Sequence, residues 1–261
     1  MRNTNAFSLV ELSIVLVILG LLTGGILTGQ SLIRAAELRS VVTEFQRYQT
    51  AIRSFQDKYM ALPGDMRNAT RFWGSANTAG AGGECANPLT DVGAVSSNTC
   101  NGNGNGMIDS PAGPSARYEE YRFWQQLANA GLIEGTYSGL DTGSGSYTIG
   151  TNAPRSRINN AGWKALYMIG NGSHYVNYNW GSVSEGNVLF LGSGAWVQDP
   201  TILTPEEAWN IDTKMDDGQP DQGKIKGGQR VNACVTNTAA PAAEYNLTNA
   251  SAVCMLLFYW N

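Results

Sequence analysis

A long apolar run near the N-terminus constrains this chain more than any other feature. Residues 7–27 read FSLVELSIVLVILGLLTGGIL and carry a single charged side chain, Glu11. About 20 such residues are enough to cross a bilayer as a helix. A secretory signal peptide would end in small residues at a cleavage site, whereas this run leads directly into an amphipathic pattern. We therefore expect the segment to stay on the mature protein as a membrane anchor.

Glu11 is the polar exception within that run. A carboxylate at membrane depth costs about 2.5–3.5 kcal/mol on insertion scales, so an acid in this place usually has a partner and a function. A position in the headgroup zone would cost little. On charge alone, the two interpretations are equally good.

The helical pattern continues past the apolar run but becomes one-sided. Apolar residues follow alternating steps of three and four, which places them on one helix face: Leu38, Val41, Phe45, Tyr48, Ile52, Phe55 and Tyr59. The opposite face carries charged residues: Arg34, Glu37, Arg39, Glu44, Arg47, Arg53 and Asp57. We predict one helix over 7–61, with a transmembrane half over 7–28, preceded by a leader over 1–6. A membrane anchor followed by an ordinary core helix predicts the same local structure.

Residues 62–261 read as a globular domain. The chain is 43% apolar and 15% charged and contains 31 glycines, which is a folded, turn-rich composition. We expect a short helix capped by Asp65, a helix over 115–130, and a third helix that starts at Thr204-Pro205-Glu206-Glu207. Short strands are predicted over 147–149, 164–169, 175–179, 188–191 and 253–259. The predicted fold class is therefore α+β, with a long N-terminal helix packed on a mostly antiparallel sheet.

The four cysteines suit two disulfides in an oxidising compartment. They lie at Cys85, Cys100, Cys234 and Cys254, and none forms a CxxC pair. Three pairings are open. We favour Cys85–Cys100 and Cys234–Cys254, because each closes a short local loop. The alternative is buried free thiols in a cytosolic protein, which the membrane segment disfavours.

Two polar segments have the residue types of calcium sites. Asn101, Asn103, Asn105 and Asp109 alternate with glycines as the oxygen ligands of a calcium loop do, although Ala112 stands at the closing position. A Gly/Asn-rich turn explains the same segment.

The second segment is acidic and contains Asp212, Asp216, Asp217 and Asp221. The solvated end of a helix is the competing interpretation. Calcium is the only cofactor that the sequence suggests.

Several function classes are disfavoured. His174 is the only histidine, which disfavours a multi-histidine metal site and a Ser-His-Asp triad. The net charge of −4 argues against broad nucleic-acid binding, which needs a basic face. No catalytic constellation is evident, so we do not expect an enzyme; a membrane-anchored periplasmic enzyme is the third-ranked alternative.

The stretch Ala6-Phe7-Ser8-Leu9-Val10-Glu11-Leu12 resembles the processing site of type IV prepilins and type II secretion pseudopilins. The resemblance implies that a prepilin peptidase cuts between Ala6 and Phe7 and methylates the new amine. It also implies that Glu11 helps to recruit each subunit to the filament. Ala6 stands where the family usually has Gly.

The resemblance extends to the globular domain in two respects. The Cys234–Cys254 loop is similar to the C-terminal disulfide loop of many pilins. Major pseudopilins of this superfamily bind calcium in their globular domain, which adds interest to the acidic segment.

The expected function is a structural subunit of a type IV pilus-like or type II secretion pseudopilus filament. The alternative is a minor pilin that displays a binding site at a filament tip, for adhesion, DNA uptake or a secretion substrate. The expected partners are other copies of the chain, other pilins or pseudopilins, prepilin peptidase, an inner-membrane assembly platform and membrane lipid. The expected location is the inner membrane before assembly, then a periplasmic or cell-surface filament.

Overall fold

The computed structural model describes residues 8–76, 97–109, 119–140, 147–168, 185–194, 202–228, 233–236 and 243–260. The chain divides into two compact units, Met1–Arg39 and Ser40–Asn261. Helix α1 (Leu9–Tyr59) contributes its N-terminal part to the first unit and its C-terminal part to the second. The predicted long helix is thus confirmed, and it is continuous through Gly20, Gly24, Gly25 and Gly29.

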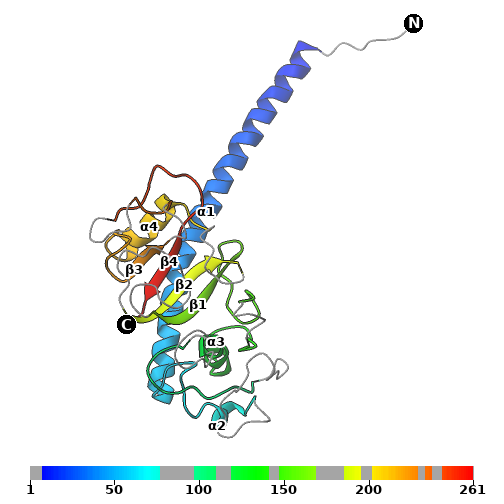
Figure 1. Cartoon of the computed structure of the whole chain (residues 1–261). Coiled ribbons are helices and arrows are strands. Elements are labelled where there is room, and N and C mark those ends of the chain that lie inside the picture. Colours follow the sequence, from blue (N-terminus) through cyan, green and yellow to red (C-terminus); the bar gives the residue numbers. More distant parts are fainter. Residues whose placement is uncertain are drawn as a thin grey trace. The chain divides into compact units, whose positions relative to one another are not determined.

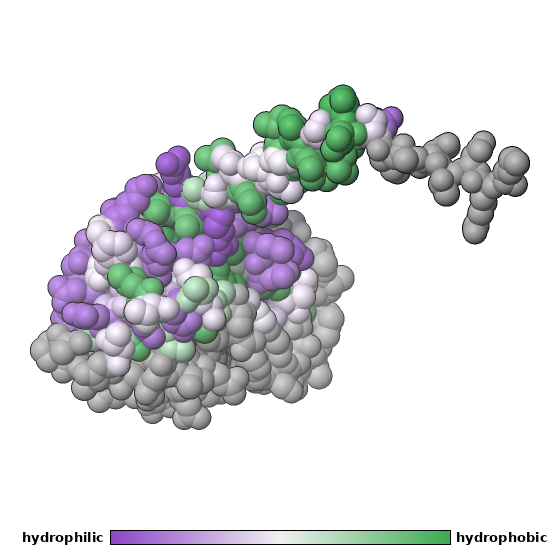
Figure 2. All heavy atoms as spheres, turned by 90° about the horizontal axis from the view of Figure 1, so that it is seen from above, coloured by the Kyte–Doolittle hydropathy of each residue, from purple (hydrophilic) through white to green (hydrophobic). Residues whose placement is uncertain are grey.

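The first unit exposes the apolar part of α1. The large apolar side chains between Leu9 and Ile33 are 50–85% exposed. Figure 2 shows apolar side chains gathered along this part of the helix. Such exposure is expected of a segment whose environment is lipid or other subunits, because water would penalise it.

The second unit is built on one antiparallel sheet (Figure 1). Its strands are β1 (Ala161–Met168), β2 (Gly186–Ser193), β3 (Ile225–Gly228) and β4 (Met255–Tyr259), in the order β1-β2-β4-β3. All three strand pairs are antiparallel, with Leu166 opposite Val188 and Phe190 opposite Leu257. The α+β fold predicted from the sequence is confirmed.

The C-terminal part of α1 packs on one face of the sheet through aromatic side chains. The ring of Phe45 stacks on Phe258 with centroids 4.9 Å apart, and Tyr48 meets Trp163 edge-on at 5.7 Å. A second cluster holds Leu166, Met168, Val188, Phe190, Met255 and Leu257. Side chains alternate along a strand, so Leu257 and Phe258 point to opposite faces, and the sheet buries apolar residues on both.

The predicted apolar face of α1 is the one that packs in the second unit. Val41, Phe45, Tyr48, Ile52 and Phe55 are all buried. Glu44, which the sequence assigned to the polar face, is an exception, because it is 7% exposed.

Three further helices are present in the described residues. Helix α3 (Glu119–Asn129) lies within the predicted 115–130 segment, and Tyr121, Trp124 and Leu127 are buried as expected. Helix α4 (Pro205–Met215) begins with the predicted capping box, in which the Thr204 side chain and Glu207 satisfy each other's backbone N–H groups.

Helix α2 (Thr70–Trp73) corrects the prediction for Asp65. The helix starts five residues after Asp65, with Ala69 at its N-cap and no side-chain cap. The Asp65 carboxylate instead accepts backbone N–H groups of the loop around Gly104. Three donors held by that loop outcompete the single cap that the local sequence offers.

The strands differ from the prediction in two places. Residues 147–149 form no strand, and Ile149 makes only an isolated bridge to Ala153. Strand β3 was not predicted, because its sequence Ile-Lys-Gly-Gly is short and rich in glycine. The predicted strand over 175–179 lies outside the described residues.

Candidate functional site

Glu11 lies in the first turn of α1, where an acid complements the positive end of the helix dipole. Its carboxylate Oε2 accepts the backbone N–H of Ser8 at 2.9 Å, and the Ser8 hydroxyl accepts the N–H of Val10 at 3.3 Å. These bonds satisfy N–H groups that the helix itself leaves without acceptors. The predicted cleavage residues Ala6 and Phe7 lie outside the described residues.

The hydroxyl groups of the exposed apolar segment are satisfied within the helix. Ser13 donates to the carbonyl of Val10, Thr23 to that of Leu19, and Thr28 to that of Gly24, each at 2.9 Å. In hydrocarbon an unsatisfied hydroxyl is costly, so these bonds suit a lipid environment. Among the described residues, α1 is the one helix long and apolar enough to cross a membrane.

The asparagines of the first predicted calcium loop bond to a buried acid. Asp109 Oδ2 accepts the side-chain amides of Asn103 at 2.6 Å and Asn105 at 3.1 Å. The amide oxygens of Asn103 and Asn105 in turn accept backbone N–H groups two residues on. Asn101 Oδ1 accepts the N–H of Thr70 at 3.0 Å. These oxygens therefore stabilise the conformation of the loop. Calcium binding at this position stays a prediction.

Two acids that sequence reasoning did not place here complete the network. Asp65 accepts the backbone N–H groups of Gly104, Asn105 and Gly106, and Glu119 accepts those of Asn103 and Asp109. Burial raises the pKa of Glu119 to about 8, with the nearby charges of Asp65 and Asp109 adding to the shift. Burial also raises the pKa of Asp65. Only the tertiary fold brings these segments together.

The second predicted calcium segment lies at the end of α4. Carboxylate oxygens of Asp212, Asp216 and Asp217 all lie within 4.8 Å of one another. Burial raises the pKa of Asp212 to about 7, although it accepts the hydroxyl of Tyr245 at 2.8 Å.

Asp216 and Asp217, two further acids of this segment, shape the turn into β3. Asp216 accepts the N–H of Ile225 at 2.9 Å, and Asp217 accepts that of Gln219 at 2.8 Å. This role resembles that of the asparagine loop, and metal binding by Asp212, Asp216 and Asp217 likewise stays a prediction.

The cysteines form covalent links in the second unit. Cys234 and Cys254 form a disulfide that joins the chain just before β4 to a segment 20 residues earlier. Cys100 is also disulfide-bonded. Its predicted partner Cys85, like His174, lies outside the described residues.

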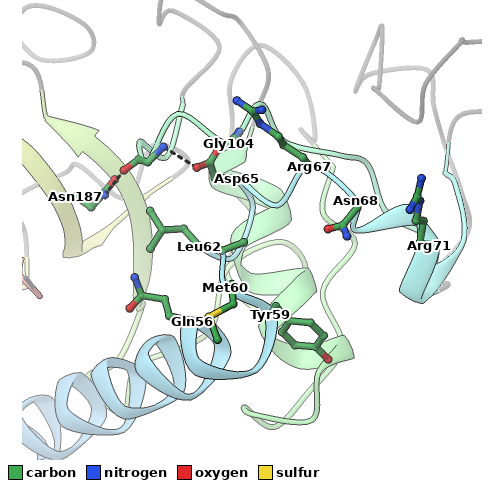
Figure 3. A pocket seen from close by; sticks show the side chains of 12 residues that line it. Gln56, Tyr59, Met60, Leu62, Asp65, Arg67, Asn68, Arg71, Gly104 and Asn187 are labelled. Carbon is green, nitrogen blue, oxygen red and sulfur yellow. Dashed lines mark hydrogen bonds between the residues drawn. The ribbon is translucent and has the colours of Figure 1, made fainter.

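A pocket of about 920 Å³ opens where α1 ends (Figure 3). Its lining comes from the end of α1, the following segment, α2, the asparagine loop and the start of β2: Gln56, Tyr59, Met60, Ala61, Leu62, Asp65, Arg67, Asn68, Arg71, Gly104, Gly106 and Asn187. Sequence reasoning did not find this pocket. Two arginines at the spacing of Arg67 and Arg71 beside a helix end are too common a pattern to indicate a pocket.

Residues 1–27 match the family model of the prokaryotic N-terminal methylation motif. With the long apolar N-terminal helix, this match fits a type IV pilin or pseudopilin. The motif implies processing by prepilin peptidase and assembly with other pilins, and it fits an inner-membrane-anchored precursor. No curated protein and no solved structure has a detectable match to this chain.

Proposed function

We propose that this chain is a structural subunit of a type IV pilus-like or type II secretion pseudopilus filament. In this proposal prepilin peptidase cuts between Ala6 and Phe7, and the new Phe7 amine is methylated. The observation that carries the proposal is an acid, Glu11, in the first turn of a helix whose apolar side chains are exposed from Leu9 to Ile33. The match to the methylation motif over residues 1–27 supports it.

The exposed apolar helix must be covered either by lipid or by the helices of other subunits. Each buried Leu, Ile or Val side chain contributes about 1.5–3 kcal/mol relative to exposure in water. In lipid this drive is absent, so packing between helices and pairing of polar groups decide whether a subunit leaves the bilayer. Glu11 supplies such a polar group.

Glu11 acts in this proposal through pairing with the Phe7 amine of a neighbouring subunit. The two residues are four apart, about one helical turn. A buried carboxylate without a cation is strongly unfavourable, whereas a close and hydrogen-bonded pair is tolerated. Pairing of Glu11 with the Phe7 amine of a neighbour would therefore stabilise the subunit in the filament relative to the subunit in lipid.

The test compares Glu11→Leu with Ser13→Leu, each expressed as the only copy of this subunit. Both variants remove a polar side chain from the apolar segment. We expect both to accumulate as cleaved protein in the membrane, because insertion of an apolar helix is favoured. Only Glu11→Leu should be lost from sheared filaments, by about tenfold or more. Wild-type amounts of Glu11→Leu in filaments would contradict the assembly role.

A further inference from the structure

The pocket at the end of α1 has the charge and shape of a binding site, and we propose that it binds an acidic peptide segment of a partner protein. Its volume of about 920 Å³ lies within the usual range of ligand sites, about 300–1,000 Å³. All of its lining residues belong to the second unit. The inference therefore does not depend on the filament role proposed for α1.

Two arginines give the pocket its charge. Within the described part of the chain, neither Arg67 nor Arg71 forms an ion pair, and both are exposed. Figure 3 shows Arg67 on the segment that follows α1 and Arg71 on the short helix α2, with Asn68 between them. A guanidinium group matches a carboxylate through two parallel hydrogen bonds. Two such groups in the lining of one pocket favour a ligand with at least two acidic groups.

The carboxylate that lines the same pocket does not cancel this charge through a salt bridge. Asp65 accepts the backbone N–H groups of Gly104, Asn105 and Gly106, so its oxygens are committed to the loop. Figure 3 shows its carboxylate turned toward Gly104.

The position of Arg67 is fixed by the loop. Its Nε donates to the carbonyl of Asn103 at 2.6 Å, which leaves its terminal nitrogens available. A Cβ on Gly104 would come within 2.3 Å of the Arg67 Nε, so the glycine makes room for this side chain. A guanidinium that is held in place loses less entropy when it binds a ligand.

Met60 offers exposed apolar surface that does not contribute to the stability of the fold. Its side chain is 87% exposed, yet its backbone has φ of 53°, a region that penalises every residue except glycine. The exposed side chain therefore adds almost no stability to the free protein, whereas the backbone conformation at this residue costs free energy. Exposed Met, aromatic and Arg side chains together are typical of the centre of a protein interface.

The remaining lining favours a peptide over other anions. The side-chain amides of Gln56 and Asn68 are exposed, and an amide can both donate to and accept from a peptide group. Leu62 and Met60 add apolar surface to the lining. Nucleic acid would need a broad basic face, whereas this chain has a net charge of −4.

The test uses the full chain in detergent and a fluorescein-labelled dodecapeptide made of four Glu-Leu-Asp repeats. We expect a saturable rise in fluorescence anisotropy that weakens as salt is added. The double variant Arg67→Glu/Arg71→Glu should weaken binding by about tenfold or more, because like charges then face the peptide. The matched control is Arg39→Glu/Arg53→Glu, which makes the same change in net charge at exposed positions of α1 outside the pocket and should leave affinity within about twofold.

Further arms separate the peptide from a general anion and from misfolding. Arg71→Gln and Met60→Ser change exposed side chains and should each weaken binding by about threefold or more while circular dichroism is unchanged. A single-stranded oligodeoxynucleotide of equal charge should compete at least tenfold less well. Absence of binding, equal loss in both double variants, or equal competition by the oligonucleotide would overturn the proposal.

Discussion

Glu44 of α1 and Trp163 of β1 are joined by a buried hydrogen bond between helix and sheet. The Glu44 Oε2 accepts the indole N–H of Trp163 at 2.8 Å, and its Oε1 accepts the backbone N–H of Arg157 at 2.9 Å. Glu44 is 7% exposed and Trp163 is fully buried. One carboxylate thus satisfies the buried indole N–H of Trp163 and a backbone N–H of the exposed residue Arg157, and it fixes how α1 sits on the sheet.

We expect Glu44→Leu to destabilise the second unit by about 1–3 kcal/mol, because this change leaves the buried indole N–H of Trp163 without an acceptor. Glu44→Gln keeps one acceptor oxygen and should fall in between. Urea unfolding of the full chain in detergent, followed by tryptophan fluorescence, measures both. The control is Asp57→Asn, an exposed acid on the same helix, which should change stability by less than about 0.5 kcal/mol. Equal stability of Glu44→Leu and the control would contradict the role of this bond.

The contrast between Glu44 and its neighbours on α1 explains what the sequence could predict. Phe45, Tyr48 and Ile52 follow the helical period, and that local signal identified their buried face correctly. Glu44 is polar, so its local pattern predicts exposure. Its partner Trp163 is 119 residues away, and only the packed fold reveals the bond.

The candidate sites also divide into features set by local spacing and features set by long-range contacts. The position of Glu11 in the first turn and the Thr204 capping box follow from local spacing, and sequence analysis found them. The network around Asp65 and Glu119 joins segments far apart in the chain. The pocket beside Arg67 depends on the same long-range contacts, so no local motif marks it.

Met60 should respond differently to two small substitutions. Its backbone N–H bonds to the carbonyl of Gln56 at 2.8 Å just after the last residue of α1, a position where glycine usually ends a helix. We expect Met60→Gly to raise the free energy of unfolding by about 1 kcal/mol, because it removes the Cβ penalty at positive φ. Met60→Ala keeps that penalty and loses only exposed surface, so its stability should match wild type. Equal effects of the two changes would show that the backbone conformation is not the cause.

The Cys234–Cys254 disulfide should contribute measurably to stability. It closes a loop with a sequence separation of 20 residues, and both sulfurs are buried. Removing a native disulfide from a secreted domain typically costs about 2–5 kcal/mol. The double variant Cys234→Ser/Cys254→Ser should therefore unfold at lower urea than wild type by that amount. Peptide mapping without reductant provides the check on pairing, and a Cys100–Cys234 link would contradict it.

The mature protein should begin at N-methylated Phe7. The match to the methylation motif over residues 1–27 and the position of Glu11 four residues later motivate this prediction. Intact mass and N-terminal peptide analysis of membrane fractions measure the outcome. Ala6→Gly should process at least as fast as wild type, whereas Ala6→Lys should block cleavage. A mature chain that starts at Met1, or after residue 27, would contradict the prediction.

Lys164 and Glu120 form an ion pair that is almost fully buried. The Lys164 Nζ lies 3.4 Å from the Glu120 Oε2 and 4.8 Å from the centroid of the Tyr147 ring. Burial lowers the pKa of Lys164, and the Glu120 charge opposes that shift. Desolvation of both charges offsets most of their attraction, so the pair is not expected to add much net stability.

A double-mutant cycle separates those two effects. Lys164→Met removes the ammonium that faces the Glu120 carboxylate and should cost about 3–5 kcal/mol. Glu120→Gln should cost a similar amount at neutral pH. The Glu120→Gln variant should then regain stability as the pH rises toward the ordinary lysine pKa near 10.4. The reason is that the unfolded chain binds the Lys164 proton more tightly than the folded chain does. The double variant Lys164→Met/Glu120→Met removes both charges and should lose much less than the sum of the single losses. Additive losses of stability would mean that the two groups do not interact in the folded protein. If the pH of maximum stability of Glu120→Gln moved to lower pH, this would contradict a lowered pKa of Lys164.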